Sequence, residues 1–110
     1  MVLQKILKAE CLVFATPVYY FGMSAQLKTM VDRFYARTME ITRKRLKAVV
    51  ITTAWNDDNI VMKAIELHFR TIFDYMQFEN KGMLFAKGSG TVQMIPSRYY
   101  IEAYNLGNSL

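Results

Sequence analysis

An aromatic cluster, Tyr19 to Phe21, is the part of this sequence best suited to bind a ligand. It follows an apolar run, Cys11 to Ala15, that stops at Thr16-Pro17, and an amphipathic segment begins after it at Ser24. Adjacent aromatic side chains offer flat faces on which a conjugated ring can stack. An apolar strand that is followed by a loop and then a helix is the building unit of open α/β sheets. We therefore expect the loop to receive a flat, conjugated ligand.

A second candidate segment, Thr53-Ala54-Trp55, follows the apolar and β-branched run Ala48 to Thr53. Continuous apolar runs are typical of parallel strands that are covered on both faces. Ligands of open parallel sheets bind beyond the carboxyl ends of the strands, so the two segments should lie side by side. Trp55 could stack on the ligand or simply fill space. Its bulk favours the second interpretation.

Periodicity predicts an α/β domain with the order helix, β, α, β, α, β, α over residues 1–110. The strands are expected at Cys11 to Ala15, Ala48 to Thr53 and Gly82 to Ala86. The helices are expected over Val2 to Lys8, from Ser24 to about Met39, from a cap at Asn56 or Asp57 to about Asp74, and from Ser97 towards Leu106 with a stop at Gly107. All three strands should be parallel, with helices on both faces of the sheet.

The bulk composition narrows the possible functions. The chain has 110 residues, 53% of them hydrophobic and 21% charged, which is typical of one small globular domain. One cysteine and one histidine, His68, exclude a disulfide framework and a metal site, and they suit the cytoplasm. The net charge is +5, but the basic run Arg43 to Lys47 carries no aromatics and predicts a solvated loop rather than a nucleic-acid site. Gly88 to Thr91 is weak as a phosphate motif.

The segment Ala15-Thr16-Pro17-Val18-Tyr19-Tyr20-Phe21-Gly22, continued by Ser24-Ala25-Gln26-Leu27-Lys28 and Asp32-Arg33, resembles the flavodoxin-like NAD(P)H-dependent FMN reductases and related iron–sulfur flavoproteins. The end of the chain, Glu102 to Gly107, is similar to the last helix of that family. The resemblance implies an open flavodoxin-like sheet of strand order 2-1-3-4-5, of which this chain holds the last three strands.

The resemblance also implies a cofactor and an activity. FMN would be the cofactor and NAD(P)H the electron donor, with no side chain needed as acid or base. The residues implied to surround the flavin ring are Thr16, Pro17, Val18, Tyr19, Tyr20, Phe21 and Gly22, with Thr53, Ala54 and Trp55 beside them.

The resemblance implies that the first two strand–helix units of the family domain have no counterpart here, except for the end of the second helix, and that the phosphate-binding loop after the first strand is among the missing parts. The resemblance therefore implies a truncated flavodoxin-like domain, residues 1–110. One interpretation is an FMN-dependent NAD(P)H oxidoreductase of flavin- or quinone-reductase type, impaired in this chain alone. The alternative is a cofactor-free family member that acts as a self-associating module. Under both, the strand Cys11 to Ala15 lacks its natural neighbour, so we expect a homodimer.

Overall fold

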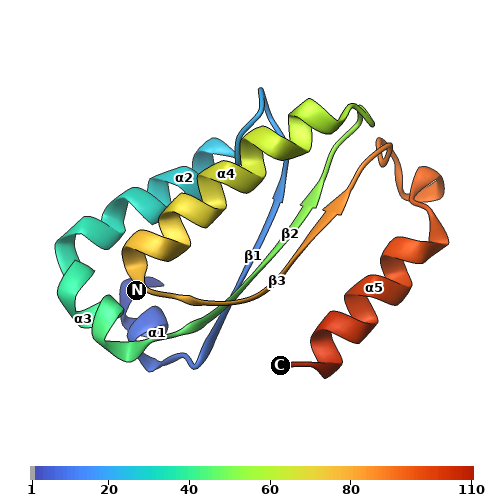
Figure 1. Ribbon diagram of the computed structural model, residues 1–110. Helices are drawn as coiled ribbons and strands as arrows, with labels where there is room; N and C mark the ends of the chain where they lie inside the picture. The colour runs from blue at the N-terminus through green and yellow to red at the C-terminus, as the bar shows by residue number, and fades with distance from the viewer. Residues whose placement is uncertain (1) are drawn as a thin grey trace.

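Three parallel strands form one open sheet with the order β1-β2-β3 (Figure 1). They are β1 (Cys11–Pro17), β2 (Lys47–Thr53) and β3 (Glu79–Ala86). This computed structural model describes residues 2–110. The expected parallel α/β fold is confirmed, with β1 at one edge of the sheet. β2 lies in the middle, which explains its almost continuous apolar sequence, because a central strand is covered on both faces.

One face of the sheet carries most of the helices (Figure 1). These are α1 (Val2–Lys8), α2 (Ala25–Asp32), the 3-10 helix η1 (Arg33–Arg37), α3 (Thr38–Lys44) and α4 (Asn59–Met76). Alternate residues of β1 point to this face, and Phe14 is buried there against Phe69 and Phe73 of α4. The ring centroids are 5.8 and 5.7 Å from that of Phe14, a tilted packing that aromatic rings prefer. This layer holds the larger core of the protein.

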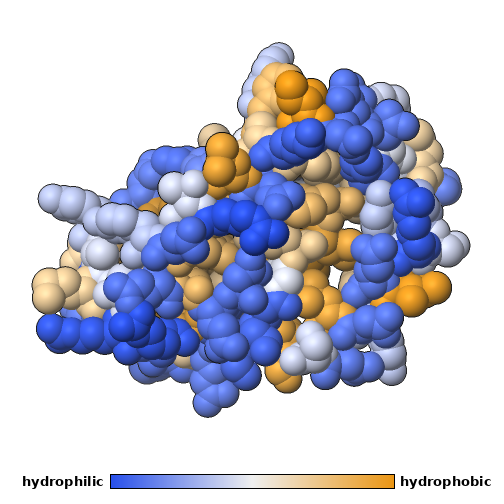
Figure 2. Space-filling view, viewed as in Figure 1, coloured by the Kyte–Doolittle hydropathy of each residue, from blue (hydrophilic) through white to orange (hydrophobic). Residues whose placement is uncertain are grey.

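The opposite face is covered by one helix, α5 (Ser97–Asn108), which follows the short 3-10 helix η2 (Val92–Met94). Gly82 of β3 has a φ of 150°, and a Cβ there would lie 2.5 Å from Cδ1 of Leu106. The glycine therefore lets α5 lie close to β3. The smaller core on this face contains Leu84, Ala86 and Tyr99. Figure 2 shows apolar surface in the hollow between the sheet and α5.

Coverage of that face declines from β3 towards β1. Leu84 of β3 is buried, whereas Val13 of β1 is 56% exposed and Ala15 is also exposed. On α5, the side chains of Tyr100, Ile101 and Tyr104 are exposed as well. The β1 half of this face is therefore open within residues 2–110.

The helix expected from Ser24 to about Met39 is wrong in its extent. Ser24 is the N-cap as predicted, but the α-helix ends at Asp32, and η1 and α3 follow. Periodicity alone did not show this break. The tightened turn lets the chain bend while Val31, Phe34 and Ile41 all stay buried. The hydroxyl of Thr38 donates to the carbonyl of Phe34 across the junction.

Smaller boundary differences have local causes. The strands run further than predicted, to Pro17 in β1, from Lys47 in β2 and from Glu79 in β3. The N-cap of α4 is Asp58, because the side chain of Asn56 accepts the Asp58 amide instead of capping the helix.

Two further expectations near helix ends are wrong. Gly107 lies inside α5, which ends at Asn108. The basic run Arg43 to Lys47 is not a loop. It closes α3 with Arg45 in the left-handed conformation and then enters β2. Within residues 2–110 no helix is both long enough and apolar enough to cross a membrane.

Candidate functional site

The aromatic segment forms a tight hairpin beyond the carboxyl end of β1. Tyr19 and Gly22 form a bridge in which each amide donates to the other's carbonyl, at 2.9 and 3.1 Å. Below it, the Thr16 hydroxyl oxygen accepts the Ser24 amide at 2.9 Å and donates to the Pro17 carbonyl at 2.8 Å. Thr16 is buried, so this contact fixes the base of the hairpin between β1 and α2.

The two residues at the tip of this hairpin are in an unusual conformation. Tyr20 and Phe21 have φ values of 48° and 69°, so both are left-handed, as the two central residues of a type I′ turn must be. Asn-Gly is the sequence that such turns prefer. Left-handed geometry costs about 1–2 kcal/mol per residue with a side chain. Strain of this kind collects at functional sites, where surrounding structure maintains it.

The strained tip presents both flat faces and hydrogen-bond donors. The Tyr20 side chain is 99% exposed, and those of Tyr19 and Phe21 are more than half exposed. The amides of Tyr20 and Phe21 donate to no acceptor within residues 2–110. A Cβ at Gly22 would meet nothing within 4 Å, and its φ is not left-handed, so the fold itself places no demand for glycine there. The hairpin thus offers an open surface for a planar ring with a polar edge.

The loop after β2 lies beside this hairpin, as the sequence predicted. The Val18 amide donates to the Thr53 carbonyl at 2.9 Å, and Pro17 pairs with Thr53 in the sheet register. Ala54 is buried, whereas Trp55 is 71% exposed and fills no space in the protein interior. The ten sequence-predicted site residues therefore gather at one edge of the sheet, from Thr16 to Gly22 on one loop and from Thr53 to Trp55 on the next.

A third loop, after β3, belongs to the same edge and was not predicted to take part. The Ser89 amide donates to the Ala54 carbonyl at 2.8 Å, and the Trp55 indole lies directly against Gly90. The position of residues 87–91 at a strand's carboxyl end was the signal available in the sequence, because parallel strands all end at one edge. The segment was interpreted only as a weak phosphate motif, so its place at this edge was not predicted.

The positive charges near this third loop are tied to neighbouring side chains. The guanidinium of Arg98 donates to the Tyr99 hydroxyl at 3.1 Å and lies over the Tyr99 ring. This contact raises the pKa of Arg98 above its ordinary value, so the group stays charged. The Lys87 ammonium donates to the side-chain carbonyl of Asn59. Among the described residues, no group of His, Cys, Asp and Glu could hold a metal ion.

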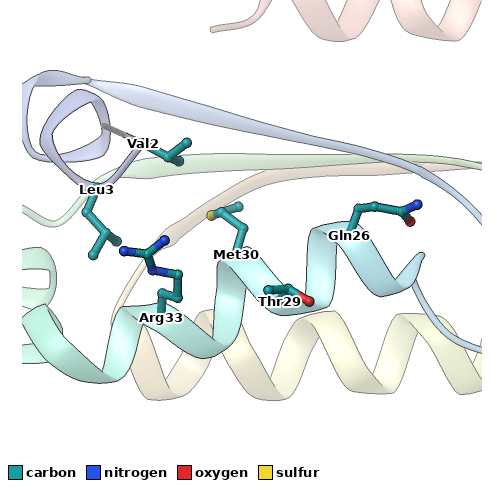
Figure 3. Close-up of a pocket in the computed structure, with 6 residues that line it drawn as sticks. All are labelled: Val2, Leu3, Gln26, Thr29, Met30 and Arg33. Atoms are coloured by element: carbon teal, nitrogen blue, oxygen red, sulfur yellow. The ribbon is translucent and has the colours of Figure 1, made fainter.

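Two of the cavities among the described residues lie between helices, away from this edge. In the first, about 170 Å³, Leu3 of α1, Met30 of α2 and Arg33 of η1 point toward one another (Figure 3). It is smaller than ordinary ligand pockets of about 300–1,000 Å³. The second, about 320 Å³, is an apolar groove between η1 and α4, lined in part by Tyr35 and Tyr75. His68 is half-buried on α4, with its ring 6.3 Å from that of Phe69, as expected for a packing residue.

Sequence comparison assigns the family. The sequence model of the NADPH-dependent FMN reductases matches residues 1–90, so the chain belongs to that family. It is also 33% identical, over 96 residues, to YwqN of Bacillus subtilis (strain 168), a protein named as an NAD(P)H-dependent FMN-containing oxidoreductase. The aligned part covers 80% of this chain and 52% of YwqN.

Solved structures agree with the fold. The Trp repressor binding protein of Bacillus subtilis superposes with a TM-score of 0.72 at 26% identity, covering 98% of this chain and 66% of that protein. A flavodoxin, WrbA-like protein of Agrobacterium tumefaciens superposes with a TM-score of 0.63 at 14% identity, covering 97% of this chain and 70% of that protein. The flavodoxin-like architecture is thus shown. The chain spans about half the length of the curated relative it matches.

Proposed function

We propose that this chain supplies the flavin-ring site of an FMN-dependent NAD(P)H oxidoreductase. The observation that carries the proposal is the strained aromatic hairpin at the carboxyl edge of the sheet, with two unbonded amides at its tip. The strain has no use in holding this fold together, since Asn-Gly would make the same turn at lower cost. Binding of a planar ligand with a polar edge would explain why the strained turn is present. Membership of the FMN reductase family supports the same interpretation.

The residues present fit such a ligand. Tyr19, Tyr20 and Phe21 would stack on or flank the ring, and the amides of Tyr20 and Phe21 would donate to its polar edge. The bare backbone at Gly22 leaves room for the ring to approach. Thr53 and Ala54 would border the ring from the loop after β2. When bound, FMN would supply hydride transfer between NAD(P)H and an acceptor, and the chain would supply orientation and shielding from water.

A direct test is a titration of the whole chain with FMN, followed by the change in flavin absorption. We expect saturable binding that weakens about tenfold or more in Tyr20→Ala, because a stacking face is lost. Tyr104→Ala is the matched control, since it removes another exposed tyrosine, on α5 and away from the hairpin. Oxidation of NAD(P)H that requires added FMN would support the activity. Absence of saturable binding, or equal losses in both variants, would contradict the proposal.

The proposal extends to assembly and location. We propose that two copies associate as a dimer, because the outer edge of β1 has no partner strand within residues 2–110. The exposed Val13 and Ala15 next to that edge support an apolar contact. The single free thiol, Cys11, is consistent with the cytoplasm, where thiols remain reduced.

A further inference from the structure

The outer edge of β1 presents backbone groups that no strand pairs within residues 2–110. At the two ends of β1, the Glu10 carbonyl accepts the Lys47 amide and the Val18 amide donates to the Thr53 carbonyl, so Glu10 and Val18 face β2. Successive residues of a strand direct their backbone groups to opposite sides, so the odd-numbered residues of β1 face the open edge. These residues are Cys11, Val13, Ala15 and Pro17.

Pro17 cannot extend pairing along this edge. It has no amide hydrogen, and its carbonyl already accepts the Thr16 hydroxyl at 2.8 Å. The segment able to pair is therefore Cys11 to Ala15, with Val13 at its centre. Natural edge strands avoid association by charged side chains or bulges, and this segment has neither.

A second copy of this chain fits this edge. Two strands related by a twofold axis run antiparallel, and the twofold dimer is the commonest closed assembly. With the axis at Val13, this residue lies opposite Val13 of the partner subunit, and Cys11 lies opposite Ala15 of the partner subunit. Each facing pair exchanges two backbone hydrogen bonds, and within the paired segment apolar side chains meet apolar side chains.

This pairing places α1 of one copy beside the aromatic hairpin of the other. The two elements lie at opposite ends of β1 (Figure 1), and antiparallel pairing brings opposite ends together. Lys8, the last residue of α1, lies at most about 10 Å from Cys11, because two residues separate α1 from β1. In Figure 3, α1 stands at the Arg33 end of the cavity, and Gln26 lies at the other end. Twofold symmetry brings the partner's α1 to the Gln26 end of α2, next to the hairpin.

Lys8 is the residue of α1 best placed to act at the hairpin. Its side chain is exposed, and its ammonium forms no ion pair or hydrogen bond within residues 2–110. Residues 2–10 carry two lysines and one acidic residue, Glu10, so this segment is positive overall. No charged side chain occurs from Thr16 to Ser24, so the hairpin itself offers no counter-charge to an anionic ligand.

We propose that two copies pair antiparallel through β1 about Val13, and that Lys8 of the partner subunit binds the phosphate group of the flavin held at the hairpin. The second part rests on the proposed function, which supplies FMN as the ligand. An ammonium donates a charge-assisted hydrogen bond to a phosphate, which is stronger than a bond between neutral groups. The ligand site is then shared between the two copies.

Disulfide formation under mild oxidation, followed on a non-reducing gel, tests the pairing. The Cα atoms of facing, hydrogen-bonded residues in an antiparallel pair are about 5.5 Å apart, within the range of a disulfide. Val13→Cys in a Cys11→Ser background should therefore link to a second copy of itself, and Ala15→Cys should link to the native Cys11. Ala15→Cys combined with Cys11→Ser is the matched control and should remain unlinked.

Titrations with FMN and with riboflavin, which has the same ring without the phosphate, test the role of Lys8. Lys8→Ala should weaken FMN binding about tenfold and leave riboflavin binding unchanged. Lys63→Ala, at an exposed lysine of α4, is the control and should change neither. A mixture of Lys8→Ala and Tyr20→Ala should contain tight FMN sites that neither variant has alone, because the intact hairpin of one copy meets the intact Lys8 of the other.

The inference is overturned if Val13→Cys and Ala15→Cys both stay unlinked, or if Lys8→Ala affects FMN and riboflavin alike. Failure of the proposed function gives a different result. Disulfide formation without FMN binding would keep the antiparallel pairing and reject both the proposed function and the phosphate contact of Lys8. FMN binding without disulfide formation, and without tight sites in the mixture, would keep the proposed function and reject the shared site.

Discussion

The amide of Ser24 donates a hydrogen bond to the hydroxyl oxygen of Thr16 over 2.9 Å, across the base of the aromatic hairpin. Thr16 ends the buried part of β1, and Ser24 is the N-cap of α2, whose side chain accepts the Leu27 amide. One hydroxyl therefore joins the strand to the helix that follows it. The residues between them are held as a short closed loop, so the tip can remain strained without opening.

Replacing Thr16 by valine should lower the free energy of unfolding by about 1–2 kcal/mol. Valine keeps the shape of the buried side chain but leaves the Ser24 amide without its acceptor. Urea unfolding followed by circular dichroism would measure the change. Thr29→Val is the control, because the Thr29 hydroxyl is exposed and bonds only within α2, and its effect should stay within about 0.5 kcal/mol. Equal effects at both positions would contradict this role.

The residues at the hairpin tip should favour ligand binding at the expense of the stability of the fold. The double variant Tyr20→Asn, Phe21→Gly installs the preferred type I′ sequence, so stability should rise by about 1–2 kcal/mol. FMN affinity should fall, because two stacking faces are lost. Thermal unfolding and FMN titration of the same sample would measure both. Tyr35→Asn, at another exposed tyrosine, should bring no such gain. A double variant no more stable than the parent would mean that the turn is unstrained.

Gly22 should be needed for the ligand and not for the fold. Since nothing in the chain lies within 4 Å of its Cβ position, Gly22→Ala and Gly22→Val should both fold. Flavin affinity should decrease from glycine to alanine and be abolished by valine, because the added atoms occupy the space that the ring would approach. Circular dichroism checks the fold and FMN titration the affinity. Unchanged affinity in the valine variant would place the ring elsewhere.

Most of the fold was predictable from the sequence because its strongest signals are local. The apolar runs that became β1 and β2, and the spacing from Val61 to Met76 in α4, each identify their element without reference to the rest of the chain. The break after Asp32 was not predictable, since it depends on how Phe34 and Ile41 meet a core built by other segments.

The candidate site was predicted in position but not in conformation. The rule that parallel strands end at one edge placed Val18 beside Thr53 correctly. No local pattern indicated that Tyr20 and Phe21, rather than Gly22, take the left-handed conformation, because glycine normally has that role. The contact between Trp55 and Gly90 depends on two loops more than thirty residues apart, which periodicity cannot join.

The packing of α5 on β3 should depend on one glycine. Gly82→Ala places a Cβ against Leu106 at a φ that side chains rarely adopt, so stability should fall by about 1–3 kcal/mol. Gly107→Ala, on the same helix and free of contacts, should raise stability by up to about 1 kcal/mol. Chemical denaturation of the two variants beside the parent would measure both shifts. Similar shifts of the same sign would show that α5 does not rest on Gly82.

The open edge of β1 should govern self-association. Val13 is exposed on the α5 face of this edge strand, so Val13→Lys should leave the fold intact while its charge opposes pairing with a second copy. Sedimentation velocity over a dilution series should show a dimer for the parent chain and a monomer for the variant. Met39→Lys, at another exposed apolar position on α3 across the sheet, should still dimerise. If the parent stays monomeric at micromolar concentration, the chain covers this edge by itself, and if Val13→Lys dimerises as tightly, the contact lies on another surface.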